Sequence, residues 1–423
     1  MREERPRGLK PVQSIEVSDR HTRPRVILLF ALIAVALIAF GFLLYGLLTE
    51  DPGWIEVEAS SRELHCGDEF IFSYCLGEGE LSPTEEKRAL QLKYSAAAVH
   101  AYRVFNRHES FEGIGNLHTL NTHVGETVTV DPALYTALEQ LERSGTRYHY
   151  LGALFVEYET LFFGPEEDPA VRGKDPLTNK EMAAFFGRLA DFAKDPEAIK
   201  LELQGDNRVC LRVSEAYLTF AEEAGIEVFV DLHRMKNAFV VDYLAAEMIA
   251  AGFTDGCLSS YDGYVRNLDG DGTGYSLNLF DLQGTNVYPA AQLEYSSARA
   301  IVSLRAFAMG ERDAYSFYTV SADRVITPYL DPEDGLCRTA TDSLIGYSRN
   351  QGCAETLLLL LPQFVREELD VVALTALTDQ GLHSVWFDEG RILYTESGLT
   401  ISSLYADETV KYQKQYVGKI SDR

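Results

Sequence analysis

The pattern of apolar and polar residues divides the chain into one long uncharged stretch and a much longer segment of short elements. From Val26 to Leu48 the sequence runs for 23 residues without a charge. As a helix rising about 1.5 Å per residue, this stretch covers roughly 34 Å, enough to span a hydrocarbon core about 30 Å thick. A helix in a globular core is the alternative, but such a core rarely surrounds so many uncharged residues on every face. The sequence therefore predicts one transmembrane helix.

The residues flanking this stretch predict how it is oriented. A cleaved signal peptide fits less well, because Tyr45, Leu47 and Leu48 stand where small residues would mark a cleavage site. The first 25 residues hold seven Lys and Arg against four acids, whereas Glu50 and Asp51 follow the stretch. Positive charge favours the cytoplasmic side. We expect a single-pass protein of the cell membrane with a cytoplasmic tail (1–25), a transmembrane helix (26–48), a linker with a first strand (49–80) and an extracytoplasmic domain (81–423).

Capping residues predict helices in the first half of this domain. An apolar run from Gly67 to Gly77 favours a strand. Ser82 followed by Pro83 and, three residues on, Glu85 forms a capping box, which predicts a helix running to about Phe105. The pairs that predict the starts of the next two helices are Asp131 with Pro132 and Thr178 with Glu181.

The remaining sequence mixes strands and helices. Its predicted elements are a hairpin over 198–214, a helix over 214–225, a strand over 226–232, a helix over 237–252, a strand over 256–261, a helix from Ala354 to about Glu368 and a hairpin over 383–395. Strands and helices intermix without a strict βαβ repeat, so the expected fold class is α+β.

The net charge of the segment after the predicted anchor limits which classes of partner it can bind. Of 38 basic and 64 acidic residues, seven and four precede the predicted anchor, which leaves a formal charge near −29 for the remainder. Such a surface repels phosphate backbones, so nucleic acid is excluded as an expected partner. The acidity favours solubility as its explanation over cation binding, although both are open.

Several short motifs were tested as metal sites. The six cysteines, among which Cys66 and Cys75 form the closest pair, lie at no zinc-ligand spacing. The segment from Asp269 to Gly274 is similar to the first half of a calcium loop, but Phe280 stands where a glutamate should close the cage. A hairpin turn between 264–268 and 275–279 explains its glycines better. The loop histidines His118 and His123 lack a third ligand in the sequence nearby.

Five segments in order resemble the ApbE-like flavin transferases, a family that moves FMN from FAD onto a threonine of a partner protein with magnesium. VDLHRMKNAFVVD (230–242) aligns with the family pattern L-D-L-G-G-I-A-K-G-Y-A-V-D, and CLSSYDGYVRNL (257–268) aligns with G-L-V-S-L-G-G-N-V-R-A-L. The others are Asn121, ETVTVDPALYTALEQLERSG (126–145) and LDPEDG (330–335). The resemblance implies an α+β, ApbE-like (T-fold-related) architecture of mixed sheets with packed helices.

The chain departs from the family where the resemblance places the flavin. Glycine pairs of the family let backbone approach a dinucleotide closely. His233 and Arg234 stand at the first pair, and Asp262 with Gly263 stands at the second. Asn237 replaces the family lysine, with Lys236 beside it. The resemblance implies Arg234, Asn237, Gly263 and Asp331 as positions that would contact a flavin nucleotide.

The metal motif departs as well. The family pattern D-A-x-x-T corresponds to 353–357, with Cys353 at the aspartate and Leu357 at the threonine. A shift of one residue restores Thr356 but puts Gly352 at the carboxylate. A thiol is a poor ligand for magnesium, which takes oxygen. No metal site is therefore expected.

Three functions follow from these observations. The leading one is a membrane-anchored, extracytoplasmic flavin-transferase-like domain that has lost FMN transfer, binds no cofactor and serves as a binding or assembly module for an extracytoplasmic protein. The second is a divergent FMN transferase or FAD pyrophosphatase, using FAD and magnesium, with candidates Asp231, His233, Lys236, Asp262 and Glu355. His233 and Arg234 would then grip a phosphate. The third is an unrelated receptor-like sensor ectodomain.

Overall fold

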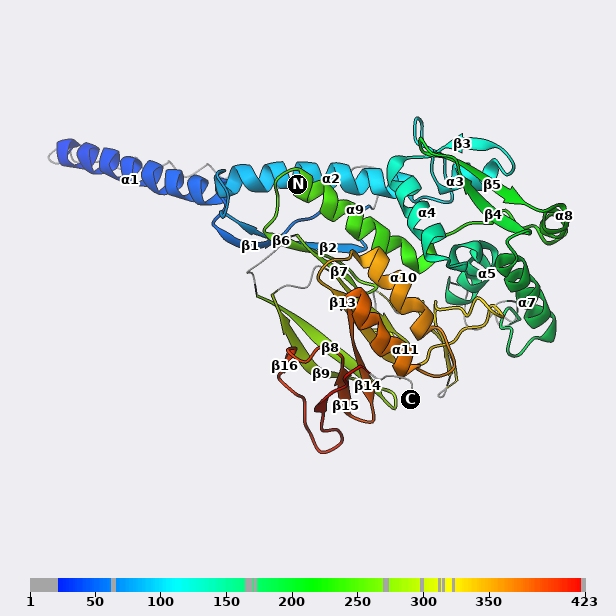
Figure 1. Ribbon diagram of the computed structural model, residues 1–423. Coiled ribbons are helices and arrows are strands. Elements are labelled where there is room, and N and C mark those ends of the chain that lie inside the picture. The colour runs from blue at the N-terminus through cyan, green and yellow to red at the C-terminus, as the bar shows by residue number, and fades with distance from the viewer. Residues whose placement is uncertain are drawn as a thin grey trace, which may run out of the picture.

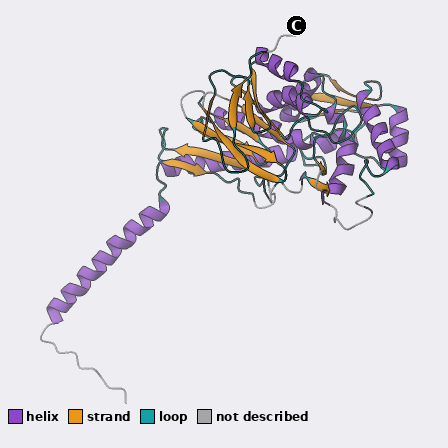
Figure 2. Ribbon diagram, turned by 90° about the horizontal axis from the view of Figure 1, so that it is seen from below, coloured by secondary structure: helices purple, strands orange, loops and turns teal. Residues whose placement is uncertain are grey.

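A computed structural model describes residues 22–61, 66–163, 170, 173–268, 274–296, 300–310, 313, 316–321 and 324–419. Within these ranges one helix is long and apolar enough to cross a membrane, α1 (Thr22–Leu48), and none of its segment Arg23–Gly41 is buried. Figures 1 and 2 show α1 standing clear of the domain. The predicted span of 26–48 lies inside this helix.

The domain holds the chain almost immediately after α1. The backbone N–H of Glu50 donates to Oγ1 of Thr84 at 2.8 Å, and the Glu50 carboxylate pairs with Lys87 at 2.6 Å. Both partners lie in the first two turns of α2 (Pro83–Val104). The segment predicted as a linker therefore contacts the domain from its second residue, and it contains two strands, described next.

A nine-stranded sheet forms the centre of the domain. Its strands, in spatial order, are β1 (Gly53–Glu56), β2 (Phe70–Leu76), β6 (Gly256–Ser260), β7 (Tyr264–Asn267), β10 (Ala300–Arg305), β13 (Ser343–Ser348), β14 (Leu382–Asp388), β15 (Arg391–Tyr394) and β17 (Gln413–Tyr416). Neighbouring strands are antiparallel except β15 and β17. Strands adjacent in space come from both ends of the chain, so the sheet closes only when the whole domain folds.

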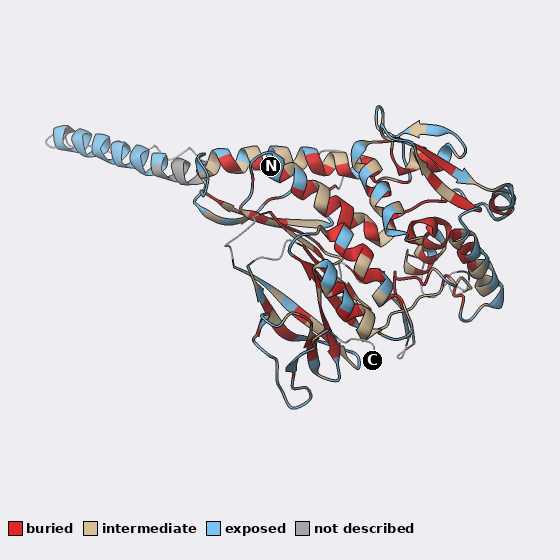
Figure 3. Cartoon of the chain, viewed as in Figure 1, coloured by how far each residue is buried: buried red, intermediate tan, exposed pale blue. Residues whose placement is uncertain are grey.

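Helices cover this sheet and build the main core. Figure 1 shows α2, α9 (Lys236–Ala250) and α10 (Cys353–Phe364) running beside one another along it. Figure 3 shows buried residues concentrated in the sheet and along α9 and α10, whereas α1 is exposed. The other helices are α3 (Leu117–Thr122), α4 (Pro132–Ser144), α5 (Gly152–Phe163), α7 (Lys180–Lys194), α8 (Glu215–Ala224) and α11 (Val371–Ala376), with 3-10 turns η2 (Tyr148–Tyr150), η3 (His233–Met235) and η5 (Leu377–Gln380).

Three smaller sheets are present in the described parts of the domain. The first is β8 (Tyr275–Gln283), β9 (Asn286–Tyr295) and β16 (Thr400–Ser402), and a second core lies between it and the central sheet. The second is β3 (Thr127–Thr129), β4 (Ile199–Leu203) and β5 (Arg208–Val213), and the third is β11 (Tyr318–Ser321) with β12 (Arg324–Ile326). The α+β class predicted from the sequence is confirmed.

Local signals predicted many element ends correctly. Ser82 caps α2 in a full capping box with Glu85, and Asp131 caps α4. The hairpin of β4 and β5 turns through Gly205, Asp206 and Asn207, all with positive φ. The third helix is capped by Asn179 rather than the predicted Thr178, because the Asn179 side chain accepts from the next turn's amides. Several elements were not predicted, among them β1, α3, α5 and α11.

Two strand predictions were wrong. Residues 226–232 form no strand, because the Asn121 side chain satisfies their backbone: its Oδ1 accepts from the amides of Phe229 and Val230, and its Nδ2 donates to the Val230 carbonyl. The hairpin proposed between 264–268 and 275–279 is also absent, because β7 pairs with β6 and β10 whereas β8 pairs with β9. Of the calcium-loop candidate from Asp269 to Gly274, residues 269–273 lie outside the described residues.

Candidate functional site

The beginning of α10 is closed by a carboxylate from α9. Oδ1 of Asp242 accepts the backbone N–H of Cys353 at 2.8 Å, and Oδ2 accepts that of Ala354 at 2.8 Å. A helix N-terminus presents such unsatisfied donors and carries partial positive charge, so a carboxylate stabilises it. Gly352 makes room for this contact, since a Cβ there would lie 2.4 Å from Oδ2 of Asp242. Burial nevertheless raises the pKa of Asp242.

The two positions that resemble the family's metal ligands face the core. Cys353 is fully buried, and its Sγ lies 3.2 Å from the Val265 carbonyl oxygen. Burial raises the pKa of this thiol well above its ordinary value, so it stays neutral. Leu357 is also buried, and the hydroxyl of Thr356 is buried without a hydrogen-bond partner. Glu355 points to solvent.

This arrangement does not fit magnesium. The ion requires near-octahedral oxygen ligands, whereas this turn offers a neutral thiol and a leucine side chain. The carboxylate nearest to it, Asp242, is already bound to two backbone amides. In the part of the chain that the structure describes, no three His, Cys, Asp or Glu side chains are grouped so as to hold a metal ion.

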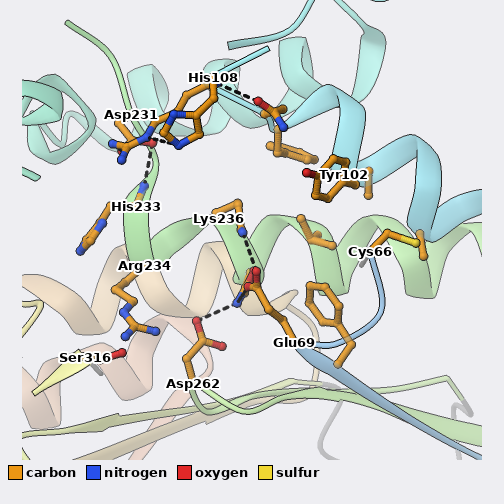
Figure 4. A pocket seen from close by; sticks show the side chains of 18 of the residues that line it. Cys66, Glu69, Tyr102, His108, Asp231, His233, Arg234, Lys236, Asp262 and Ser316 are labelled. Carbon is orange, nitrogen blue, oxygen red and sulfur yellow. Dashed lines mark hydrogen bonds and ion pairs between the residues drawn. The ribbon is translucent and has the colours of Figure 1, made fainter. Parts of the chain in front are cut away.

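A cavity of about 350 Å³ lies at the beginning of η3 and α9. Figure 4 shows four of the predicted candidates around it, namely Asp231, His233, Lys236 and Asp262. Arg234 and Asn237 also line it, and aromatic side chains of Phe70, Tyr102, Phe105 and Phe162 form its apolar wall. Six residues that the sequence analysis singled out thus meet at one cavity. Asp331, Gly263 and Glu355 are not among the residues that line it.

One side of the cavity is held by an arginine between two acids. Arg107 pairs with Asp231 and with Glu159, and the side chains of Arg107 and Asp231 are 7% and 8% exposed. A buried charge is tolerated only when paired and hydrogen-bonded. Asp231, a candidate catalytic acid, is therefore engaged in a structural ion pair and also accepts the backbone N–H of His233 at 3.2 Å.

The opposite side is a chain of polar contacts that we call the cleft floor, made of Glu69, Asn237 and Asp262. Nδ2 of Asn237 donates to Glu69 at 2.7 Å and to Asp262 at 3.0 Å. Lys236 pairs with Glu69 at 3.1 Å. Burial alone would raise the pKa of Glu69, but Lys236, Asn237 and Arg234 together lower it, whereas burial raises the pKa of Asp262.

His233 fills space beside the cavity. Its backbone has φ +43°, in the left-handed region, and its ring stacks on Phe155 with centroids 4.3 Å apart. Burial, followed by the charges of Arg234, Arg107 and Lys236, lowers its pKa well below the ordinary value, so the ring is neutral. A neutral, stacked imidazole is poorly suited to hold a phosphate.

The other candidates have local structural contacts. Gly263 has φ +105°, and a Cβ there would lie 2.4 Å from the Ser303 carbonyl oxygen, so the turn between β6 and β7 requires glycine. Asp331 accepts the backbone N–H of Glu333 within its own turn. His118 in α3 and His123 just after it have ring nitrogens at 3.2 Å and 2.9 Å from the carbonyl oxygens of Arg107 and Thr119, respectively.

No motif in the sequence pointed to Glu69, Arg107 and Glu159. Glu69 lies just before β2, Arg107 lies after α2 and Glu159 lies in α5. They are far apart in the sequence, and only the folded chain brings them together at the cavity. The cysteines are all described, and none forms a disulfide, including the close pair Cys66 and Cys75.

Comparisons with known proteins give a fold. No protein family's sequence profile matches the chain, and no curated protein sequence matches it. Among solved structures, the ApbE protein of Thermotoga maritima is similar with a TM-score of 0.54 and 14% identity, over 82% of this chain and 97% of that one. The flavin transferase ApbE from Vibrio cholerae gives 0.52 and 12%, over 84% of this chain and 98% of that one. The domain therefore has the fold of the ApbE flavin transferases.

Proposed function

We propose that this chain is a membrane-anchored, extracytoplasmic domain of ApbE fold that does not perform magnesium-dependent FMN transfer and acts as a binding or assembly module. The observation that carries this proposal is the closed beginning of α10. Asp242 saturates its first amides, while a neutral Cys353 thiol and the Leu357 side chain occupy the positions that resemble metal ligands.

The flavin side of the cleft supports the same conclusion. His233 and Arg234 stand where the resembled family has glycines, and both line the cavity, while Asp262 adds a carboxylate to the cleft floor. A pyrophosphate carries negative charge, so a floor that contains Glu69 and Asp262 opposes its approach.

The anchor is supported by α1 and the charges around it. The helix is exposed along Arg23–Gly41, and basic residues outnumber acidic ones before its uncharged stretch 26–48. By the positive-inside tendency the domain lies outside the cytoplasm. This orientation is tested in intact cells with a membrane-impermeant maleimide and a Glu223→Cys variant. Labelling above that of the parent chain supports the proposal, and labelling only after permeabilisation overturns the orientation.

The loss of activity is tested by incubating the full chain, in detergent micelles, with FAD, magnesium and a threonine-bearing acceptor protein. We expect no release of FMN or AMP by chromatography and no flavin retained after desalting. The flavin transferase ApbE from Vibrio cholerae serves as the positive control. Released FMN and AMP, or a flavin-labelled acceptor, would establish the divergent enzyme instead.

A further inference from the structure

A second hollow, which we call the acidic hollow, adjoins the cavity at the beginning of α9. It has a volume of about 640 Å³ and shares Glu69, Phe70, Arg234, Asn237 and Asp262 with that cavity. Its size falls in the range of small-molecule sites, about 300–1,000 Å³. The cleft floor therefore faces two spaces, and the second differs from the first in charge.

The acidic hollow is strongly negative. Six carboxylates from distant parts of the chain line it: Glu56, Glu58, Asp68, Glu69, Asp262 and Asp313. Arg234 is the one cation among its described lining residues. Glu69 and Asp313 are paired, with Lys236 and Arg305 respectively. Glu56 and Glu58 are exposed and make no ion pair with any described residue. Like charges held together in this way attract a cation.

Two acceptor atoms in the floor of the hollow receive no hydrogen bond. Asn237 is 5% exposed, and its Oδ1 has no partner; Oδ1 of Asp262 is also buried without one. The orientation of the amide is set by its neighbours, because its Nδ2 lies between the carboxylates of Glu69 and Asp262. An unsatisfied buried acceptor is costly, about 1–3 kcal/mol. Both unsatisfied atoms are acceptors, so the missing partner is a donor.

We propose that the acidic hollow binds an organic cation through a primary ammonium group, which donates to Asn237 and Asp262 while Glu56 and Glu58 supply the attracting charge. An ammonium has three donors and no acceptor, which matches a floor of acceptors. A divalent metal fits less well, because no described group of three or more ligating side chains converges there. The inference rests on the proposed binding function and names the chemistry of its ligand.

The same ammonium could be carried by a free diamine or by a lysine of a polypeptide partner. Calorimetric titration of the full chain in nanodiscs of zwitterionic lipid separates the two, with 1,5-diaminopentane as one probe and an acetylated, amidated lysine-containing peptide as the other. Binding of either probe supports the proposal and identifies the source. Absence of heat with both probes at millimolar concentration overturns it.

A matched pair of variants separates the hollow from general acidity. Glu56→Gln with Glu58→Gln removes two charges at the hollow, and Glu222→Gln with Glu223→Gln removes two exposed charges on α8, at the far end of the domain (Figure 1). We expect the first pair to weaken binding about tenfold and the second to change it less than twofold. Equal weakening by both pairs would refute the site.

The outcome is independent of the flavin assay. If FAD is processed, the proposed function fails whatever the diamine does. If neither FAD nor an ammonium probe is bound, the proposed absence of FMN transfer stands, and only the ligand assigned to the acidic hollow is refuted. Inorganic phosphate serves as the negative control, because the same carboxylates repel it.

Discussion

The N-termini of α10 and α9 differ in how their polar groups are hydrogen-bonded. At α10 the first two backbone amides are bonded within the chain to Asp242, and the thiol of Cys353 lies against the Val265 carbonyl, although the buried hydroxyl of Thr356 has no partner. At α9 no side chain caps the helix, two hollows open beside it, and acceptors of Asn237 and Asp262 remain without donors. The first amides of α10 are satisfied within the chain, whereas the floor beside α9 leaves two acceptors open, and these are the atoms on which the proposed ammonium site rests.

The largest effect is expected from breaking the closed region. Asp242→Ala leaves two amides at the start of α10 without their charged acceptor, which should lower the free energy of unfolding by about 3 kcal/mol. Denaturant titration of the solubilised chain, followed by the fluorescence of the buried Trp386, measures it. The control is Glu355→Ala, because Glu355 lies in the same first turn of α10 but is exposed. It should change the free energy of unfolding by less than about 0.5 kcal/mol. If Asp242→Ala left the free energy of unfolding unchanged, α10 would not need this cap.

A pH series distinguishes the neutral histidine of the cleft from its surroundings. The folded pKa of His233 lies well below the ordinary 6.5, so the unfolded chain takes up a proton that the folded chain refuses. Its contribution to stability is complete above pH 6.5 and is lost as the pH falls below that value, at about 1.4 kcal/mol per pH unit.

The matched variant for this series is His233→Asn, since asparagine tolerates the left-handed backbone of this position. Its stability should fall less steeply below pH 6.5 than that of the parent, while buried His149, whose pKa is also lowered by burial, keeps part of the slope in both. Identical slopes would mean that His233 is protonated in the folded chain.

The smallest effect is expected in the open region. Asn237→Ala removes two donors to Glu69 and Asp262 but also removes an acceptor that was already unsatisfied. We expect a loss of about 1 kcal/mol, measured in the same denaturant titrations. A loss as large as that for Asp242→Ala would contradict the contrast between the two regions.

The sequence predicted best what short-range chemistry decides. The helix starts at Ser82 and Asp131 follow from side chains that cap their own next turn. The apolar, β-branched segment 226–232 misled, because its backbone is satisfied by Asn121 and by the His149 carbonyl rather than by a neighbouring strand. A partner more than 100 residues away leaves no local signal.

The site divides in the same way. Asp231, His233, Lys236 and Asp262 were found because they stand in segments that resemble a known family, and the structure gathers them at one cavity. Arg107 and Glu159 were not, because their importance lies in an ion pair formed across the fold. The orphan acceptor of Asn237 could be seen only once both of its amide donors were placed.

The contacts of Glu50 with α2, only two residues after α1 ends, limit the distance between the acidic hollow and the lipid. From Leu48, where α1 ends, to Glu56 on the rim of the hollow there are eight residues, which even fully stretched reach roughly 28 Å. In the proposed topology, a ligand must therefore be delivered within a thin layer above the bilayer. Targets that are themselves confined to that layer meet the hollow far more often than molecules diffusing through the bulk.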